Sequence, residues 1–272
     1  MSRVLMRAAI TLAVLLSGCS ADAQRVLEQA EGRWREGNYE DAIRLNTLLY
    51  NRERQGPYGA KALLKIGDIY YLNLRKLQDA VDTYNKLKDQ YPGRPEEIKA
   101  RQQLAAIYAN EIGDLTQAIL EYDRLLEAPE LENRSEIRFQ RARACFLKGD
   151  YDRALRELRQ LEADGVTGHL AHQVYLKIGN IYQIQRKYEE AAVCFQKVMD
   201  APCIDCRRRA RIHLMETQEA LFNFDRAIAV IRSLDRTPEN EEVVQREVRR
   251  LSEKRRRLDS GQPPSWGAGH RR

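Results

Sequence analysis

Gly149-Asp150-Tyr151-Asp152-Arg153-Ala154 decides the fold, because its pattern of a glycine, an aromatic residue and an alanine recurs along the chain. It returns as Gly37-Asn38-Tyr39-Glu40-Asp41-Ala42 and, without the glycine, as Lys187-Tyr188-Glu189-Glu190-Ala191 and Asn223-Phe224-Asp225-Arg226-Ala227. Ala80 and Ala118 mark two further copies. The six alanines are separated by 38, 38, 36, 37 and 36 residues, and this regular spacing predicts six structural repeats.

Most repeats carry a second apolar stripe upstream of the alanine, with the spacing of one face of a helix. The stripe is clearest at Leu63, Ile66, Gly67 and Tyr70, and at Val174, Ile178, Gly179 and Tyr182. A glycine, asparagine or charged break separates the two stripes. Each repeat is therefore predicted to be a helix, a tight turn and a second helix, in which the alanine lets the two backbones approach closely.

Ile178-Gly179-Asn180-Ile181-Tyr182, followed by Tyr188, Ala191 and Phe195, resembles the pattern of small and large residues in tetratricopeptide repeats. The resemblance covers residues 23–236 and implies an all-α, right-handed superhelical solenoid of about six helix pairs, with a partner-binding groove on its concave side. The second and third repeats have one extra residue before the alanine. We expect these extra residues to lie in the turns.

The N-terminus has the pattern of a secretory signal, because Arg3 and Arg7 precede the apolar run of residues 8–16. A run of nine residues is too short to span a bilayer. Leu16-Ser17-Gly18-Cys19 resembles the bacterial lipobox, which implies that residues 1–18 are a lipoprotein signal peptide and that Cys19 carries a lipid. The alternative is a plain secretory signal with a chance cysteine. Residues 19–22 are then a linker, and Ser20 in place of aspartate favours the outer membrane, facing the periplasm.

The composition, 43% hydrophobic and 32% charged residues with 8 prolines, is that of a helical protein. Basic residues concentrate at the C-terminus, where residues 246–272 contain nine Lys or Arg and three Asp or Glu. Thr237 as an N-cap, with Val244, Val248 and Leu251 on one face, predicts a basic capping helix over residues 237–258 and a disordered tail over 259–272. Lys254, Arg255, Arg256 and Arg257 on this helix either keep the end of the array in solution or bind an anionic surface such as lipid headgroups.

The first helix of each repeat is predicted to face the groove, as the tetratricopeptide resemblance implies. We expect partner contacts from Trp34, Tyr71, Phe139, Phe146, Asn180 and Gln183. Aromatic residues bury a large area for little lost rotamer freedom, which makes them common anchors for a partner. The alternative for each of these residues is packing between repeats. The Lys and Asn set with which some family members bind a terminal carboxylate is absent, since the corresponding positions carry Asp68, Ala106, Arg143, Asn180 and Glu216.

Cys203-Ile204-Asp205-Cys206 is the one sequence that suggests chemistry, because two thiols at this spacing form a redox disulfide or half a zinc site. Three interpretations remain open: a structural disulfide, a four-ligand zinc site completed by His169 and His172 from the preceding repeat, and reduced cysteines without a role. Arg207 follows the second cysteine, which excludes c-type haem attachment. Cys145 and Cys194 lie on apolar stripes and are assigned to the core.

No phosphate-binding loop, zinc-protease helix or nucleophile elbow occurs in the sequence, so we expect neither an enzyme nor a cofactor. The expected function is a protein-binding scaffold for a cell-envelope complex, with no nucleic acid as partner. A narrower hypothesis is β-barrel assembly or envelope-division coordination, because an anchor followed by repeats resembles lipoproteins of these systems. The hypothesis from another class is a periplasmic redox or zinc protein that works through Cys203 and Cys206.

Overall fold

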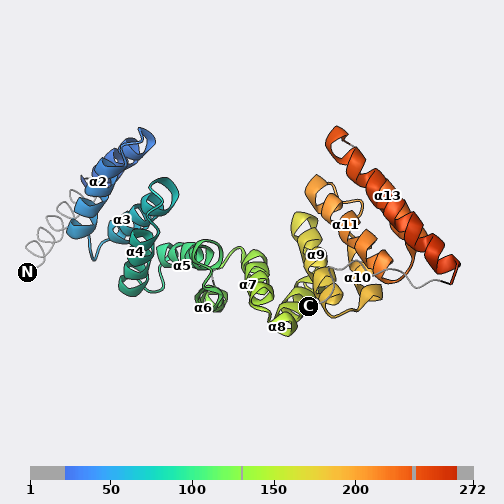
Figure 1. Cartoon of the computed structure of the whole chain (residues 1–272). Helices are drawn as coiled ribbons and strands as arrows, with labels where there is room; N and C mark the ends of the chain where they lie inside the picture. Colours follow the sequence, from blue (N-terminus) through green and yellow to red (C-terminus); the bar gives the residue numbers. More distant parts are fainter. Residues whose placement is uncertain (1–21, 130, 235–236, 262–272) are drawn as a thin grey trace, which may run out of the picture. The chain divides into compact units, whose positions relative to one another are not determined.

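The computed structural model describes residues 22–129, 131–234 and 237–261, and all regular structure in these ranges is helical (Figure 1). Residues 22–35 are helical, and the further elements follow in order. They are α2 (Tyr39–Arg52), α3 (Pro57–Asp68), η1 (Ile69–Asn73), α4 (Leu77–Gln90), α5 (Pro95–Ile107), η2 (Tyr108–Ile112), α6 (Leu115–Glu127), α7 (Arg134–Lys148), α8 (Tyr151–Ala163), α9 (Gly168–Ile184), α10 (Tyr188–Gln196), α11 (Ile204–Ala220), α12 (Phe224–Arg232) and α13 (Pro238–Asp259).

The helices form six successive pairs followed by α13, which confirms the predicted repeat. Each of the six alanines that define the repeat lies near the start of a second helix, and each is fully buried. An alanine has no side chain beyond Cβ, so at this position the first helix of the pair packs directly against the backbone of the second. The spacing of the alanines therefore reports the spacing of the helix crossings.

The turn inside each pair places one residue in the left-handed region, always five positions before the alanine. Glycine occupies this position in three repeats, for example Gly149 with φ of 87°. In the other three repeats Arg75, Arg186 and Phe222 adopt φ values of 55°, 59° and 60°. A residue with a Cβ atom is strained there by roughly 1–2 kcal/mol, so packing of the helix pair outweighs the local preference.

The extra residue of the second and third repeats lies in a helix and not in the turn, which corrects the prediction. In these two repeats the first helix ends in a π-helical turn, η1 in repeat two and η2 in repeat three. Each backbone hydrogen bond of a π-turn spans five residues, one more than in an α-helix. In η1 the Leu74 backbone N–H donates to the Ile69 carbonyl oxygen at 3.0 Å. The wider turn absorbs the insertion, and the distance from the left-handed residue to the alanine stays constant.

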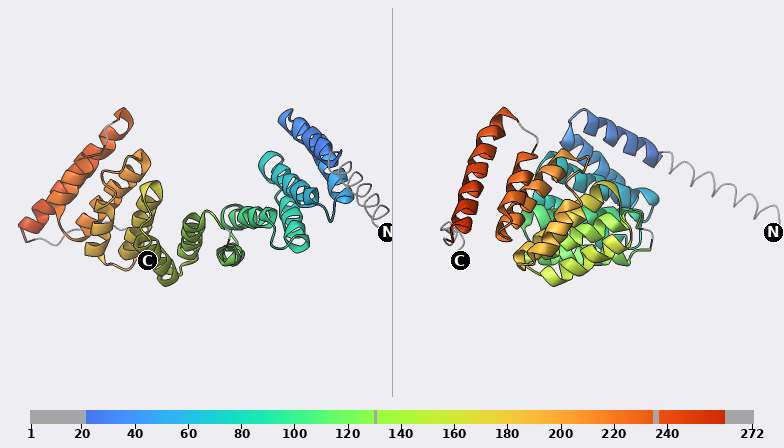
Figure 2. Two further views of the ribbon diagram at one scale, coloured as in Figure 1. Left: turned by 180° about the vertical axis from the view of Figure 1, so that it is seen from behind. Right: turned by 90° about the vertical axis from the view of Figure 1, so that its right-hand side faces the viewer.

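The chain divides into two compact units, residues 1–132 and 133–272, and each has a core of its own. In the first unit Leu63, Tyr84 and Leu104 belong to one cluster of buried side chains. In the second unit Phe195, Leu214 and Leu251 belong to another. Figure 2 shows the helices of each unit side by side.

Helix α13 closes the second unit at its C-terminal end. Thr237 caps it through a capping box with Asn240, whose Oδ1 accepts from the Thr237 backbone N–H at 2.9 Å. Val244, Val248 and Leu251 are buried in the core of the second unit, as their spacing predicted. The helix ends at Asp259, one residue beyond the predicted boundary.

Predictions for the two ends of the chain fall mainly outside the described residues. The signal peptide (residues 1–18), Cys19 and most of the linker precede residue 22, which is already helical. Most of the tail predicted over residues 259–272 follows residue 261. Among the described helices none combines the length and the apolarity that a bilayer crossing requires.

Candidate functional site

Trp34 and Tyr71 lie on the first helices of repeats one and two, in the first unit. The Trp34 side chain is 41% exposed, and its Nε1–H donates to Asn73 Oδ1 at 3.0 Å. The Lys65 ammonium lies 5.4 Å from the centroid of the Trp34 ring. Tyr71 is half-buried, and burial together with the nearby Glu111 carboxylate raises its pKa. Both aromatic rings are at least partly accessible to a partner.

Phe139 and Phe146, both on α7, differ in accessibility. Phe139 is 4% exposed, so the prediction that it contacts a partner is corrected: neighbouring parts of the fold cover the ring, and it belongs to the core. Phe146 is half-buried and packs edge-on against Tyr151, with ring centroids 5.6 Å apart. The Lys177 ammonium lies over the Phe146 ring, 4.6 Å from its centroid. Phe146 thus lies beside a cation from the next repeat.

Gln183 and Asn180 lie one turn apart on α9 and have different surroundings. Gln183 Nε2 donates to Thr217 Oγ1 at 2.8 Å and to the His213 carbonyl oxygen at 3.2 Å, so this side chain joins α9 to α11. Gln183 therefore has the alternative role considered above, packing between repeats. Asn180 Oδ1 is buried without a hydrogen-bond partner among the described residues. It is the one predicted contact that offers an acceptor in need of a donor.

A group of cations that the sequence analysis did not single out lies on the first helices of repeats four, five and six. Lys177 on α9 has a lowered pKa because of burial first, and then because of the positive charges of Arg143 on α7 and Arg209 on α11. Like charges on neighbouring helices repel each other, and an anion placed among them relieves that repulsion. Lys177 lies one helical turn before Asn180, which was a predicted partner contact. The helical spacing places the two side chains on one face of α9, and this is the sequence signal by which Lys177 is found. We call Arg143, Phe146, Lys177 and Arg209 the basic-aromatic group.

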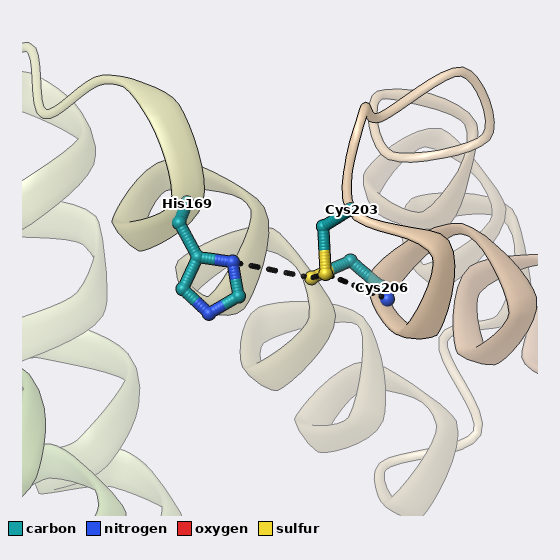
Figure 3. A group of neighbouring side chains, drawn as sticks. All are labelled: His169, Cys203 and Cys206. Carbon is teal, nitrogen blue, oxygen red and sulfur yellow. Dashed lines mark hydrogen bonds between the residues drawn. The ribbon is translucent and has the colours of Figure 1, made fainter.

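His169, Cys203 and Cys206 come together at the junction of repeats five and six (Figure 3). His169 is the second residue of α9, Cys203 is the N-cap of α11, and Cys206 lies in the first turn of α11. The His169 Nδ1 atom is 3.5 Å from Cys206 Sγ, and the two Sγ atoms are 2.6 Å apart. Both cysteines are free thiols in this structure.

The two thiols of this cluster differ in acidity. A hydrogen bond from the Cys206 thiol and another from the Cys206 backbone N–H, at 3.2 Å, lower the pKa of Cys203. Burial and the proximity of Cys203 raise the pKa of Cys206 to about 11. His172, the fourth ligand of the predicted zinc site, is not part of the group, because it lies almost one turn further along α9. Its Nδ1 atom is buried and has no hydrogen-bond partner within the described part of the chain.

The basic run on α13 is largely paired within the fold. Lys254 Nζ is 2.7 Å from Glu219 Oε1, and Arg255 and Arg257 pair with Asp225 and Glu253, each at 2.5 Å. Lys254 is held by a partly buried carboxylate, so the expected contact of this residue with an anionic surface is corrected. Arg256 is exposed.

Sequence profiles of the tetratricopeptide repeat match residues 61–94, 104–168 and 172–201. These ranges include four of the six buried alanines, Ala80, Ala118, Ala154 and Ala191. The chain contains tetratricopeptide repeats. No curated protein sequence matches it.

Three solved structures share the fold, and one of them, YrrB, is a tetratricopeptide-repeat protein. PilW, a widely conserved type IV pilus biogenesis factor, is similar with a TM-score of 0.58 at 13% identity, over 83% of this chain and 98% of PilW. YrrB, described as having an unusual peptide-binding site, gives 0.55 at 18% identity, over 78% of this chain and 98% of YrrB. MamA gives 0.54 at 18% identity, over 64% of this chain and 88% of MamA.

Proposed function

We propose that this tetratricopeptide-repeat protein is a non-catalytic scaffold that is lipid-anchored through Cys19 to the outer membrane and binds an acidic segment of an envelope protein. The repeat fold supports the scaffold function, since stacked helix pairs present an extended surface. The lipobox-like Leu16-Ser17-Gly18-Cys19 supports the anchor. The proposal that the bound segment is acidic rests on the basic-aromatic group.

The basic-aromatic group suits an extended acidic peptide. Three cations from three consecutive first helices provide charge along a line of repeats, and the Phe146 ring beside Lys177 offers apolar area. Asn180, one turn from Lys177, has an oxygen that a backbone N–H of a bound peptide would satisfy. Attraction between the cations and the peptide increases the rate of association and weakens as salt is added.

A charge-reversed variant tests the partner surface. Lys177→Glu with Arg209→Glu places two carboxylates where the proposal needs cations, and the matched control is Arg156→Glu, an exposed residue on the second helix α8. After crosslinking in cells and mass spectrometry, we expect the double variant to lose its main envelope partner and the control to keep it. A double variant that melts like the parent and retains every partner contradicts the proposed surface.

A Cys19→Ser variant tests the anchor separately. We expect fatty-acid labelling of the chain to disappear and the protein to move from the membrane fraction to the soluble periplasmic fraction. If the variant still carries fatty acid, or if the parent is never labelled, the anchor is disproved while the partner surface remains testable.

A role in β-barrel assembly or in division coordination is a narrower form of this proposal. The assembly lipoprotein that the sequence resembles has five repeats in its family, and this chain has six helix pairs in its described residues. Depletion of the protein followed by measurement of outer-membrane porin levels tests the assembly role, which requires those levels to fall.

A further inference from the structure

The cluster of His169, Cys203 and Cys206 does not take part in the proposed scaffold function. Its three donor atoms lie within 4.8 Å of one another and come from the starts of two helices in consecutive repeats. Two sulfurs and one imidazole nitrogen are the donors that zinc prefers. Cys203 and Cys206 span the first turn of α11, so their sulfurs face the same side of the helix.

The distances of the cluster suit tetrahedral coordination. Zinc binds sulfur at about 2.3 Å and imidazole nitrogen at about 2.0–2.1 Å, which places neighbouring donor atoms about 3.5–3.8 Å apart at tetrahedral angles. The His169 Nδ1 to Cys206 Sγ distance of 3.5 Å already has this value. The two sulfurs, 2.6 Å apart, need to separate by roughly 1 Å, which a rotation of the half-buried Cys203 side chain supplies.

Groups around the donors support the metal-bound state. The Cys206 backbone N–H points at Cys203 Sγ from 3.2 Å, and the positive end of the α11 dipole lies at the same place; both stabilise a thiolate. The Gln173 side-chain amide nitrogen lies 2.9 Å from His169 Nε2, so this amide borders the ring on the side away from the sulfurs. Zinc on Nδ1 leaves the proton on Nε2, and the amide then has to turn over so that its oxygen accepts that N–H. Metal-binding histidines usually have such a partner on their second nitrogen.

We propose that His169 Nδ1, Cys203 Sγ and Cys206 Sγ bind one zinc ion, with the fourth coordination position open to water. Binding replaces two S–H bonds with two Zn–S bonds and releases both protons to solvent, so zinc affinity rises with pH. The ion joins α9 to α11 and therefore stabilises the junction between repeats five and six by mass action. His172 takes no part, although it belongs to the same His-x-x-His sequence.

Zinc binding by the full-length chain tests the site. Every protein carries Cys19→Ser, to exclude that thiol, and is kept reduced with a phosphine, because a disulfide between Cys203 and Cys206 would use the same two sulfurs. Zinc content by elemental analysis and competition with a chromogenic chelator give stoichiometry and affinity, and Co²⁺ substitution reports thiolate ligands by charge-transfer absorption. We expect one zinc per chain and a cobalt spectrum with two thiolates.

Single variants then assign the ligands. We expect Cys203→Ser and Cys206→Ser to weaken zinc binding about 100-fold or more, and His169→Ala about 10- to 100-fold, because losing a ligand costs at least as much as losing a group that supports one. His172→Ala is the matched control on the same helix and should bind within about twofold of the parent. Circular dichroism confirms that each variant is folded. A reduced parent without stoichiometric zinc, or equal losses for His169→Ala and His172→Ala, would overturn the proposal.

Discussion

Gly179 and Gly67 show at the scale of one residue why small side chains recur on the first helices. A Cβ atom at Gly179 would lie 2.5 Å from the Phe195 ring, and one at Gly67 would lie 2.5 Å from the Tyr84 ring. Both rings belong to the second helix of the same pair and are fully buried. The glycine is needed for close approach of the helices, and backbone flexibility plays no part in this requirement.

We expect Gly179→Ala to lower the free energy of unfolding by about 1–3 kcal/mol, because the buried Phe195 ring must move to admit the methyl group. The matched control is Gly32→Ala, where the new Cβ meets nothing within 4 Å inside a helix. That change should stabilise the protein by about 0.5–1 kcal/mol, since alanine has the higher helix propensity. Urea titration followed by circular dichroism measures both, and a neutral Gly179→Ala would show that the two helices are not held at this distance.

Helix α13 shows at the scale of an element how a terminal helix is attached to a repeat array. Its apolar face is buried, and its basic face is paired with Glu219 on α11, whose oxygens are 2.5 Å from Arg250 and 2.7 Å from Lys254. Arg250 also pairs with Glu247 on its own helix, at 2.8 Å. These pairs favour one orientation of α13 on the array.

The attachment of α13 should depend on pH through Glu219. Burial favours a higher pKa for this carboxyl group, but the hydrogen bonds from Arg250 and Lys254 outweigh burial and hold its pKa below the ordinary value of 4.5. A depressed pKa of this kind contributes stability that is complete above pH 4.5 and is lost as the pH falls through the folded-state value. Acidification below that point should therefore loosen α13.

We expect Glu219→Gln to cost about 1–3 kcal/mol of unfolding free energy at pH 7, since it removes charged hydrogen bonds to two cations. Below pH 4.5 the stability of the parent should fall more steeply than that of the variant, so that the two curves converge. Thermal melts across this pH range supply the measurement, with Glu253→Gln, an exposed residue on α13, as control. Parallel curves for parent and Glu219→Gln would contradict the assigned role of Glu219.

At the scale of the whole molecule, the chain behaves as two units because each buries its own apolar side chains. Each core cluster draws its members from one unit alone. Repeat arrays derive their stability from each repeat and its immediate neighbours, so a local change in packing has local consequences. Destabilisation of one unit should therefore leave the other intact.

We expect Gly67→Ala to increase amide hydrogen exchange in α3, η1 and α4, and to leave α9–α12 unchanged; Gly179→Ala should have the reverse effect. The double variant should show the sum of the two patterns, because the two glycines pack against different rings in different units. Hydrogen exchange read by mass spectrometry resolves the helices separately. Increased exchange in both units on either single change would show that the chain unfolds as one cooperative block.

The candidate site was less accessible to prediction than the fold. Phe139 and Phe146 are both aromatic residues on α7, yet Phe139 is buried in the core and Phe146 is half-buried beside the Lys177 ammonium. The sequence paired His169 and His172 as equals, and the start of α9 brings only His169 to the sulfurs. The sequence predicted that Lys254 is a surface cation, and the structure shows that it pairs with Glu219 on α11.

The sequence by itself determined the number of helix pairs, the positions of their crossings and the buried face of α13. These properties follow from small and apolar residues at regular separations, and each depends on contacts between helices that are neighbours along the chain. Only the tertiary structure decided that the extra residues of repeats two and three widen a helix into a π-turn, and that arginine or phenylalanine occupies the left-handed turn as glycine does. It also brought His169 to Cys206, 37 positions apart. Such outcomes depend on how the packing of a whole repeat outweighs local conformational preference, and that balance is settled in three dimensions.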